Sequence, residues 1–168
     1  MSELISATKP AFYVVKRSFL WVISKFSKYL QKKFFPLDLE LIRVELKDVP
    51  KIFCRGHDTY FRIDLAASNY SPYYDYEILS IQIECDIGRK KFVTIPSTKF
   101  ISLKSGTYSQ DYSFNKYLGF SGEKRAKEQF NDTEVCNGSI ELNMTLVTPF
   151  GVKSHKVSIS NQFHLVDN

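Results

Sequence analysis

The chain has 168 residues, of which 43% are hydrophobic and 24% are charged, and its formal net charge is +5. This composition excludes a disordered chain, and the length is that of one ordinary folded domain. The fourteen Phe and ten Tyr favour β-sheet, because aromatic side chains suit pleated, half-buried surfaces.

The positive charge is concentrated near the start of the sequence. Residues 4–37 carry seven Lys and Arg and no acid, whereas residues 38–168 carry sixteen cations and seventeen acids. A basic segment before a nearly neutral body is typical of an arm, an anchor or a targeting element. A basic patch over the whole domain would suggest nucleic acid, and the confinement of the charge to one segment makes nucleic acid the less favoured partner.

Residues 11–34 have the spacing of an amphipathic helix between Pro10 and Pro36. One face carries apolar side chains at i, i+3, i+4 and i+7: Phe12, Val15, Phe19, Val22, Ile23, Phe26, Tyr29, Leu30 and Phe34. The opposite face carries Arg17, Lys25, Lys28 and Lys32. Trp21 lies off the main stripe, so the first half is apolar on more than one side.

This segment is too often charged to cross a bilayer, since its longest uncharged run, residues 18–24, is far shorter than the roughly 20 residues required. The recurrent cations also do not fit a signal peptide. We expect contact with a membrane surface, or with protein: the β body, a partner or a second copy in a homo-oligomer. The residues expected to make it are Phe12, Phe19, Trp21, Val22, Phe26 and Leu30, with Lys25, Lys28 and Lys32.

From residue 37 onward the apolar period changes to 2, which predicts β-strands. The alternation 37, 39, 41 slips to 42, 44, 46, as a β-bulge would produce. A turn at 88–91 predicts a hairpin. Further strands are expected at 60–65, 79–87, 92–95, 100–103, 108–114, 140–146, 152–159 and around 163–165. We therefore predict a helical arm over 1–36, then a mainly β domain over 37–168, an antiparallel two-sheet sandwich of seven to nine strands.

The strand at 79–87 has the clearest pattern, with five apolar side chains in unbroken alternation: Leu79, Ile81, Ile83, Cys85 and Ile87. We expect all five to face the core. Residues 115–138 are polar and do not alternate, which predicts a long loop with a short helix at 122–130.

Three stretches of the body resemble immunoglobulin- and fibronectin-type sandwiches, including their late-embryogenesis-abundant (LEA) subgroup. They are Ala67-Ser-Asn69 through to Phe92, Leu103-Lys-Ser-Gly106 and Thr148-Pro-Phe-Gly151. The resemblance implies the fold and no functional residue. The Cys–Trp–Cys core of true immunoglobulin domains is absent, because the single Trp is Trp21.

No catalytic, cofactor-binding or metal site is expected. The sequence has no CxxC, HExxH, Walker, GxGxxG or GxSxG motif, and its three His have no metal-ligand spacing. His57 beside Asp58 suits a turn better than an acid–base pair. Because these motifs are absent, we expect a non-enzymatic protein. Three cysteines suit free thiols in a reducing compartment, so we expect it to be cytoplasmic. The basic amphipathic segment would make it peripheral at the membrane.

The segment SNYSPYYDY holds Tyr70, Tyr73, Tyr74 and Tyr76 in a strand-end loop. Tyrosines there either bind a partner, as rigid amphipathic rings do in paratopes, or cover the edge of the core. The sequence as a whole predicts a binding or anchoring module. Two alternatives stay open: a viral or phage coat-like assembly protein, and a small-ligand or lipid binder.

Overall fold

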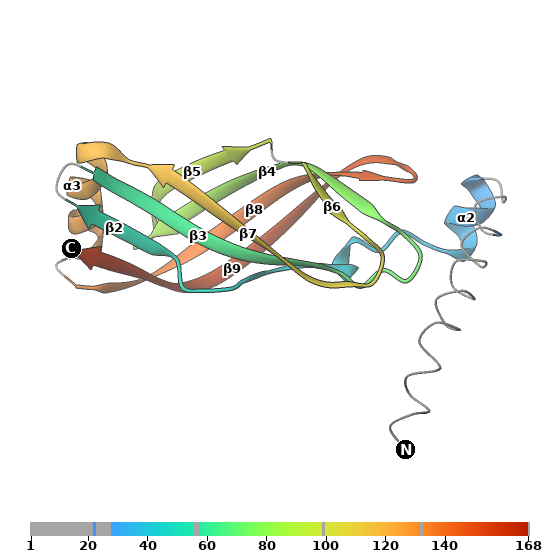
Figure 1. Cartoon of the computed structure of the whole chain (residues 1–168), viewed down its shortest axis with the longest axis horizontal. Coiled ribbons are helices and arrows are strands. Elements are labelled where there is room, and N and C mark those ends of the chain that lie inside the picture. Colours follow the sequence, from blue (N-terminus) through green and yellow to red (C-terminus); the bar gives the residue numbers. More distant parts are fainter. Residues whose placement is uncertain (1–21, 23–27, 56–57, 99, 132, 168) are drawn as a thin grey trace, which may run out of the picture. The chain divides into compact units, whose positions relative to one another are not determined.

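The computed structural model describes residues 22, 28–55, 58–98, 100–131 and 133–167 (Figure 1). The chain divides into two units, Met1–Asp38 and Leu39–Asn168, each described by itself. The first contains helix α2 (Lys28–Phe34), and Val22 is also helical. The rest of the helix predicted over 11–34 lies outside the described residues. None of the described helices is long and apolar enough to cross a membrane.

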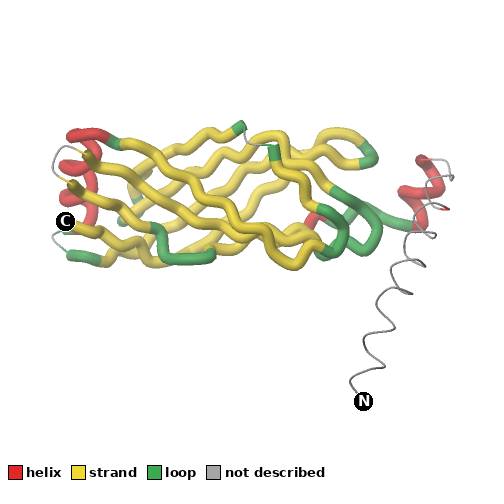
Figure 2. The backbone as a smooth tube through the Cα atoms, viewed as in Figure 1, coloured by secondary structure: helices red, strands yellow, loops and turns green. Residues whose placement is uncertain are grey.

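The second unit, called the β unit below, is mainly β (Figure 2). Its elements are η1 (Leu39–Leu41), β1 (Ile42–Leu46), β2 (Lys51–Arg55), β3 (Asp58–Asn69), β4 (Tyr76–Ile87), β5 (Lys90–Ser97), β6 (Ile101–Leu103), β7 (Thr107–Tyr117), α3 (Gly119–Phe130), β8 (Val135–Thr148) and β9 (Gly151–Asp167).

All nine strands belong to one sheet, in the order β1-β3-β2-β9-β8-β4-β5, with β6 paired to β4 and β7 to β3. The pairs are antiparallel except β2 with β9, which is parallel. Strands β1 and β2 share one edge of β3, because β2 pairs with residues 58–62 and β1 with residues 65–69. Strand β7 takes the other edge of β3.

The sheet curls around a single core. Phe61 on β3 packs edge-to-face on Phe92 of β5 at 6.4 Å between ring centroids, although four strands separate β3 from β5 in the sheet order. Phe61 also stacks on Phe163 of β9 at 6.2 Å. Figure 1 shows β3 and β7 passing in front of β4 and β8, as this contact requires. The buried Ile and Leu side chains of these strands lie between them.

Helix α3 covers one end of this core. Its buried residues, Gly122, Ala126 and Phe130, recur every fourth position and so lie on one face. The Arg125 guanidinium lies 5.9 Å from the centroid of the Phe92 ring. The predicted long loop at 115–138 was therefore wrong: β7 extends to Tyr117, α3 follows, and β8 begins at Val135. The helix expected at 122–130 is confirmed and is longer.

Strand β4 confirms the predicted core positions with one exception. Ile81, Ile83, Cys85 and Ile87 are buried, but Leu79 is only half-buried. The register with β8 shifts between Ile78 and Ser80, so Ile78 takes the inward place. A bulge has this effect because it inserts one residue into a period of two.

Three other expectations need correction. The phase slip before Ile42 is a 3-10 turn, η1, rather than a β-bulge. The strands expected at 152–159 and 163–165 are one long strand, β9. Strand β2 was not predicted. The hairpin at 88–91 is confirmed: Gly88 and Arg89 both have positive φ, 57° and 65°, which is the two-residue turn that matches the twist of a hairpin.

Candidate functional site

Most of the predicted contact residues of the N-terminal segment lie outside the described residues: Phe12, Phe19, Trp21, Lys25 and Phe26. Val22 is 46% exposed. In α2, Lys28 is exposed and Leu30 is half-buried, and Lys32 belongs to the same helix. Tyr29 and Phe34 of α2 are exposed apolar side chains. The contact predicted for this segment stays a prediction.

Three loops of the β unit meet at the end where the chain enters at Leu39, and we call this the tyrosine end. They are residues 70–75, 104–106 and 149–150. The Tyr70 N–H donates to the carbonyl of Leu41 at 2.9 Å. The Tyr74 and Phe150 rings pack edge-to-face at 5.6 Å between centroids, which joins the first loop to the β8–β9 turn.

The side chain of Asn69 organises this end. It is fully buried, and its Nδ2 donates to the carbonyls of Tyr74 (2.9 Å) and Leu103 (3.0 Å). Its Oδ1 accepts from the Ser71 N–H at 2.9 Å. Its backbone carbonyl accepts from the Gly106 N–H at 3.0 Å. One amide therefore fixes the tyrosine loop against the β6–β7 turn, and both its nitrogen and its oxygen have hydrogen-bond partners.

The four tyrosines divide into two buried and two exposed rings. Tyr74 and Tyr76 are buried, and burial raises the pKa of Tyr74. Tyr70 and Tyr73 are 44% and 36% exposed. Each of the two readings of this loop therefore describes two of the tyrosines: one pair covers the core edge, and the other pair is accessible to a partner.

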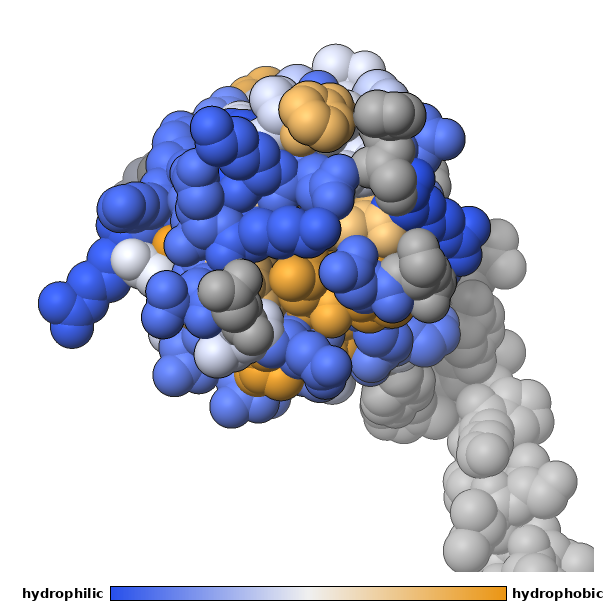
Figure 3. All heavy atoms as spheres, turned by 90° about the vertical axis from the view of Figure 1, so that its left-hand side faces the viewer, coloured by the Kyte–Doolittle hydropathy of each residue, from blue (hydrophilic) through white to orange (hydrophobic). Residues whose placement is uncertain are grey.

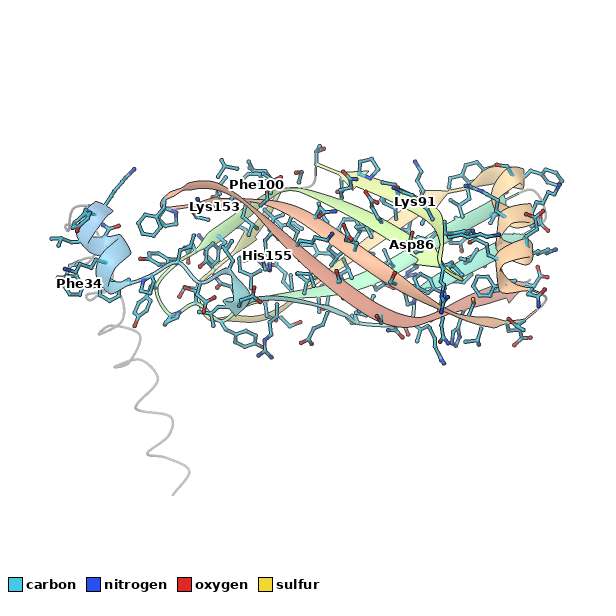
Figure 4. The ribbon with its side chains drawn as sticks, turned by 180° about the vertical axis from the view of Figure 1, so that it is seen from behind. Phe34, Asp86, Lys91, Phe100, Lys153 and His155 are labelled. Carbon is cyan, nitrogen blue, oxygen red and sulfur yellow. The ribbon has the colours of Figure 1, made fainter. Side chains whose placement is uncertain are left out.

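Other exposed side chains extend the surface of the tyrosine end. Arg43 lies over the Tyr70 ring, 5.4 Å from its centroid. Val152, just after the β8–β9 turn, is 61% exposed. Its neighbour Lys153 is exposed as well, and Figure 4 labels it at the start of β9. Lys104 is ion-paired with Asp75 at 3.2 Å. Aromatic, aliphatic and cationic groups thus lie together on this end.

A cleft of about 480 Å³ lies beside this end, between β1 and β9. It is lined by consecutive residues of both strands, Ile42–Glu45 on one side and His155–Ser158 on the other. From Gly151 to Phe163, β9 pairs with β8 and with no other described strand. The other backbone edge of β9 is therefore unpaired there, and at residues 155–158 it faces the cleft. His155 is nearly buried on β9 beside it (Figure 4).

The opposite end of the β unit, the α3 end, also exposes apolar side chains. Figure 3 shows them set among hydrophilic residues, and Tyr117, Phe120 and Val135 are exposed there. Arg55 ends β2 and Asp58 begins β3 at this end, and the two residues are paired; residues 56 and 57 lie outside the described residues, so the turn stays a prediction. In the described part of the chain, no three His, Cys, Asp or Glu side chains lie close enough together to hold a metal ion.

The three cysteines are free thiols in different surroundings. Burial raises the pKa of Cys85 to about 12 and also raises that of Cys54, whereas Cys136 is half-exposed. We predict that one thiol, Cys136, reacts quickly with a thiol reagent at pH 8 in the native protein, because only thiolate is nucleophilic. The other two should react after denaturation. Loss of the fast phase in a Cys136→Ser variant checks the assignment, and fast reaction of a second thiol would contradict it.

No family model matches the chain, and no curated protein matches it. Solved structures are similar in fold. An X-ray structure of a Northeast Structural Genomics Consortium target has a TM-score of 0.53 at 13% identity, covering 77% of this chain and 89% of its own. The solution structure of a LEA-like protein has a TM-score of 0.49 at 12% identity, covering 98% and 88%. A protein from Archaeoglobus fulgidus has a TM-score of 0.46 at 9% identity, covering 73% and 94%. At these identities the likeness concerns the fold alone.

Proposed function

We propose that the chain is a non-enzymatic anchoring module. Residues 11–34 attach it peripherally to an anionic membrane surface, and the β unit is presented from there to a partner. The observation that carries the proposal is the segregation of charge, with seven cations and no acid in residues 4–37 beside a nearly neutral body. Dense negative charge on lipid headgroups is the counterpart of such a segment.

The magnitudes favour stable attachment. Each large apolar side chain taken out of water contributes about 1.5–3 kcal/mol. Each lysine near an anionic surface contributes about 1 kcal/mol. Two or three buried Phe and three Lys therefore contribute about 6–12 kcal/mol, a range that includes the roughly 8 kcal/mol of a micromolar Kd.

We propose further that the β unit is a two-sheet sandwich of the immunoglobulin, fibronectin and LEA type. On this view β2 and β9 join two layers, with β1, β3 and β7 in one and β4, β5, β6 and β8 in the other. The contact of Phe61 with Phe92 across the core supports the division. Such a scaffold holds its loops in place without a contribution from residues 11–34.

Flotation with phosphatidylcholine–phosphatidylserine vesicles tests the attachment. Replacing Phe19 and Phe26 with Ser in the full chain should lower the partition coefficient at least a hundredfold, because it removes about 3 kcal/mol or more of apolar transfer. Replacing Lys25, Lys28 and Lys32 with Gln should lower it about a hundredfold at low salt, by removing about 3 kcal/mol of attraction. The second effect should shrink as salt is added.

A matched control keeps the number of lost charges and changes their place. Lys90, Lys116 and Lys124 are exposed on the β unit, and replacing them with Gln should leave flotation unchanged. Failure of the wild-type chain to float would refute the proposal. Concentration-dependent oligomers that are lost in the Phe19/Phe26 variant would show instead that the segment joins copies of the chain, as in an assembly protein. Unfolding of that variant would show that the segment belongs to the core.

A further inference from the structure

We infer that the tyrosine end is the face of the β unit that meets the anionic phospholipid surface, with the rings of Tyr70 and Tyr73 at headgroup level. This rests on the proposed attachment through residues 11–34 and adds to it the orientation of the β unit. It also gives a purpose to the exposed parts of the Tyr70 and Tyr73 rings.

Chain length limits which end can face the membrane. Helix α2 ends at Phe34 and the β unit begins at Leu39, so five residue steps span at most about 18 Å. The tyrosine loop is bonded directly to the entering chain, through Tyr70 N–H and the carbonyl of Leu41. Strand β3 runs twelve residues from the α3 end to the tyrosine end, about 40 Å. Residues up to Phe34 are therefore tethered within about 18 Å of the point where the chain enters the tyrosine end, whereas the α3 end lies about one β3 length further along the β unit.

The side chains of the tyrosine end suit a membrane interface. Tyr rings are enriched at headgroup level, because one edge of the ring is apolar and the hydroxyl is hydrated. The Arg43 guanidinium over the Tyr70 ring places a cation beside it, where a lipid phosphate would lie. Val152 projects from the next hairpin with most of its surface in water.

The charges of the tyrosine end determine how it would contribute to membrane binding. Its cations and acids are equal in number: Arg43, Lys104 and Lys153 against Glu40, Asp75 and Glu77. Long-range attraction to anionic lipid must then come from residues 4–37, and the tyrosine end adds shallow insertion of its rings. Removing the rings should weaken binding while leaving its salt dependence unchanged.

Paramagnetic broadening tests the orientation in the full chain. In phosphatidylcholine–phosphatidylserine nanodiscs with a headgroup spin label, amide signals of residues 70, 71, 73–75 and 150–152 should broaden strongly, and those of Gly88, Arg89 and α3 should not. Replacing Tyr70 and Tyr73 with Ser should lower vesicle binding about tenfold. The matched pair at the α3 end, Tyr117 and Phe120 replaced with Ser, should bind like wild type.

The outcomes separate this inference from the proposed attachment. A chain that floats, with broadening at the α3 end or none in the β unit, overturns the orientation and leaves the attachment standing. Equal binding by the two double variants overturns it too. A wild-type chain that does not float overturns both.

Discussion

Replacing Asn69 with Ala should lower the free energy of unfolding by about 3 kcal/mol. The side chain is fully buried and makes three hydrogen bonds, to the carbonyls of Tyr74 and Leu103 and from the N–H of Ser71. Truncation would leave all three backbone groups without this partner, and each buried polar group left unsatisfied costs about 1–3 kcal/mol. The surrounding backbone can relax in part around the smaller side chain, so the expected total lies at the lower side of their sum.

Urea denaturation followed by circular dichroism measures the effect, and the melting temperature should fall by about 10 °C. An Asn69→Asp variant separates hydrogen bonding from volume. It keeps the shape and the acceptor for Ser71, but it turns an oxygen toward two carbonyls, so it should be at least as unstable as the Ala variant. The control is Asn115→Ala on the exposed part of β7, expected within about 0.5 kcal/mol of wild type. A loss below 1 kcal/mol for Asn69→Ala would show that the amide does not organise this end.

The sequence predicted best where one physical rule acts alone. In β4, Ile81 to Ile87 face the core because period-2 alternation has a single solution for a half-buried strand. The Gly88–Arg89 turn follows from two strands joined by two residues with positive φ. The burial of Ala126 and Phe130 could also be predicted, because residues four apart lie on one face of the expected helix. Gly122, four residues before Ala126, is buried on the same face.

The sequence predicted strands poorly where pairing with strands distant in the chain determines their existence or register. Strand β2 offers only Ile52 and Cys54 as an alternating pair, and it exists because β3 and β9 hydrogen-bond to it from both sides. The displacement of Leu79 depends on a register shift against β8, which is more than fifty residues away in the chain. A local pattern contains neither partner.

The candidate site shows the same limit at the level of single side chains. The run from Tyr70 to Tyr76 was recognisable as a tyrosine-rich loop, yet which rings are exposed depends on Asn69, Ser71 and the β6–β7 turn. In the sequence, Asn69 stands out only as part of the stretch through Phe92 that resembles immunoglobulin- and fibronectin-type sandwiches. Its role becomes visible once Leu103 and Gly106, more than thirty residues further on, are placed beside it.

Gly138 on β8 should not tolerate even a methyl group. A Cβ at this position would lie 2.3 Å from the backbone oxygen of Asp86 and 2.6 Å from the Phe163 ring. Gly138 pairs with Ile87 of β4 and with Asn161 of β9, so its backbone is held on both sides. The Phe163 ring is fully buried and stacked on Phe61, which leaves it little room to move.

We expect Gly138→Ala to lower the free energy of unfolding by about 3 kcal/mol, because overpacking of a rigid site typically costs 1–3 kcal/mol and here the nearest atom is backbone. The usual gain of about 0.4–1 kcal/mol from restricting the unfolded chain is too small to offset it. Ser139→Ala, one residue along on the exposed side of β8, is the matched control and should be nearly neutral. Combining Gly138→Ala with Phe163→Leu should cost less than the sum of the two single losses, since the smaller side chain relieves part of the clash. Gly138→Ala stability equal to that of wild type in urea would mean that β4 and β8 are not held together at this position as described.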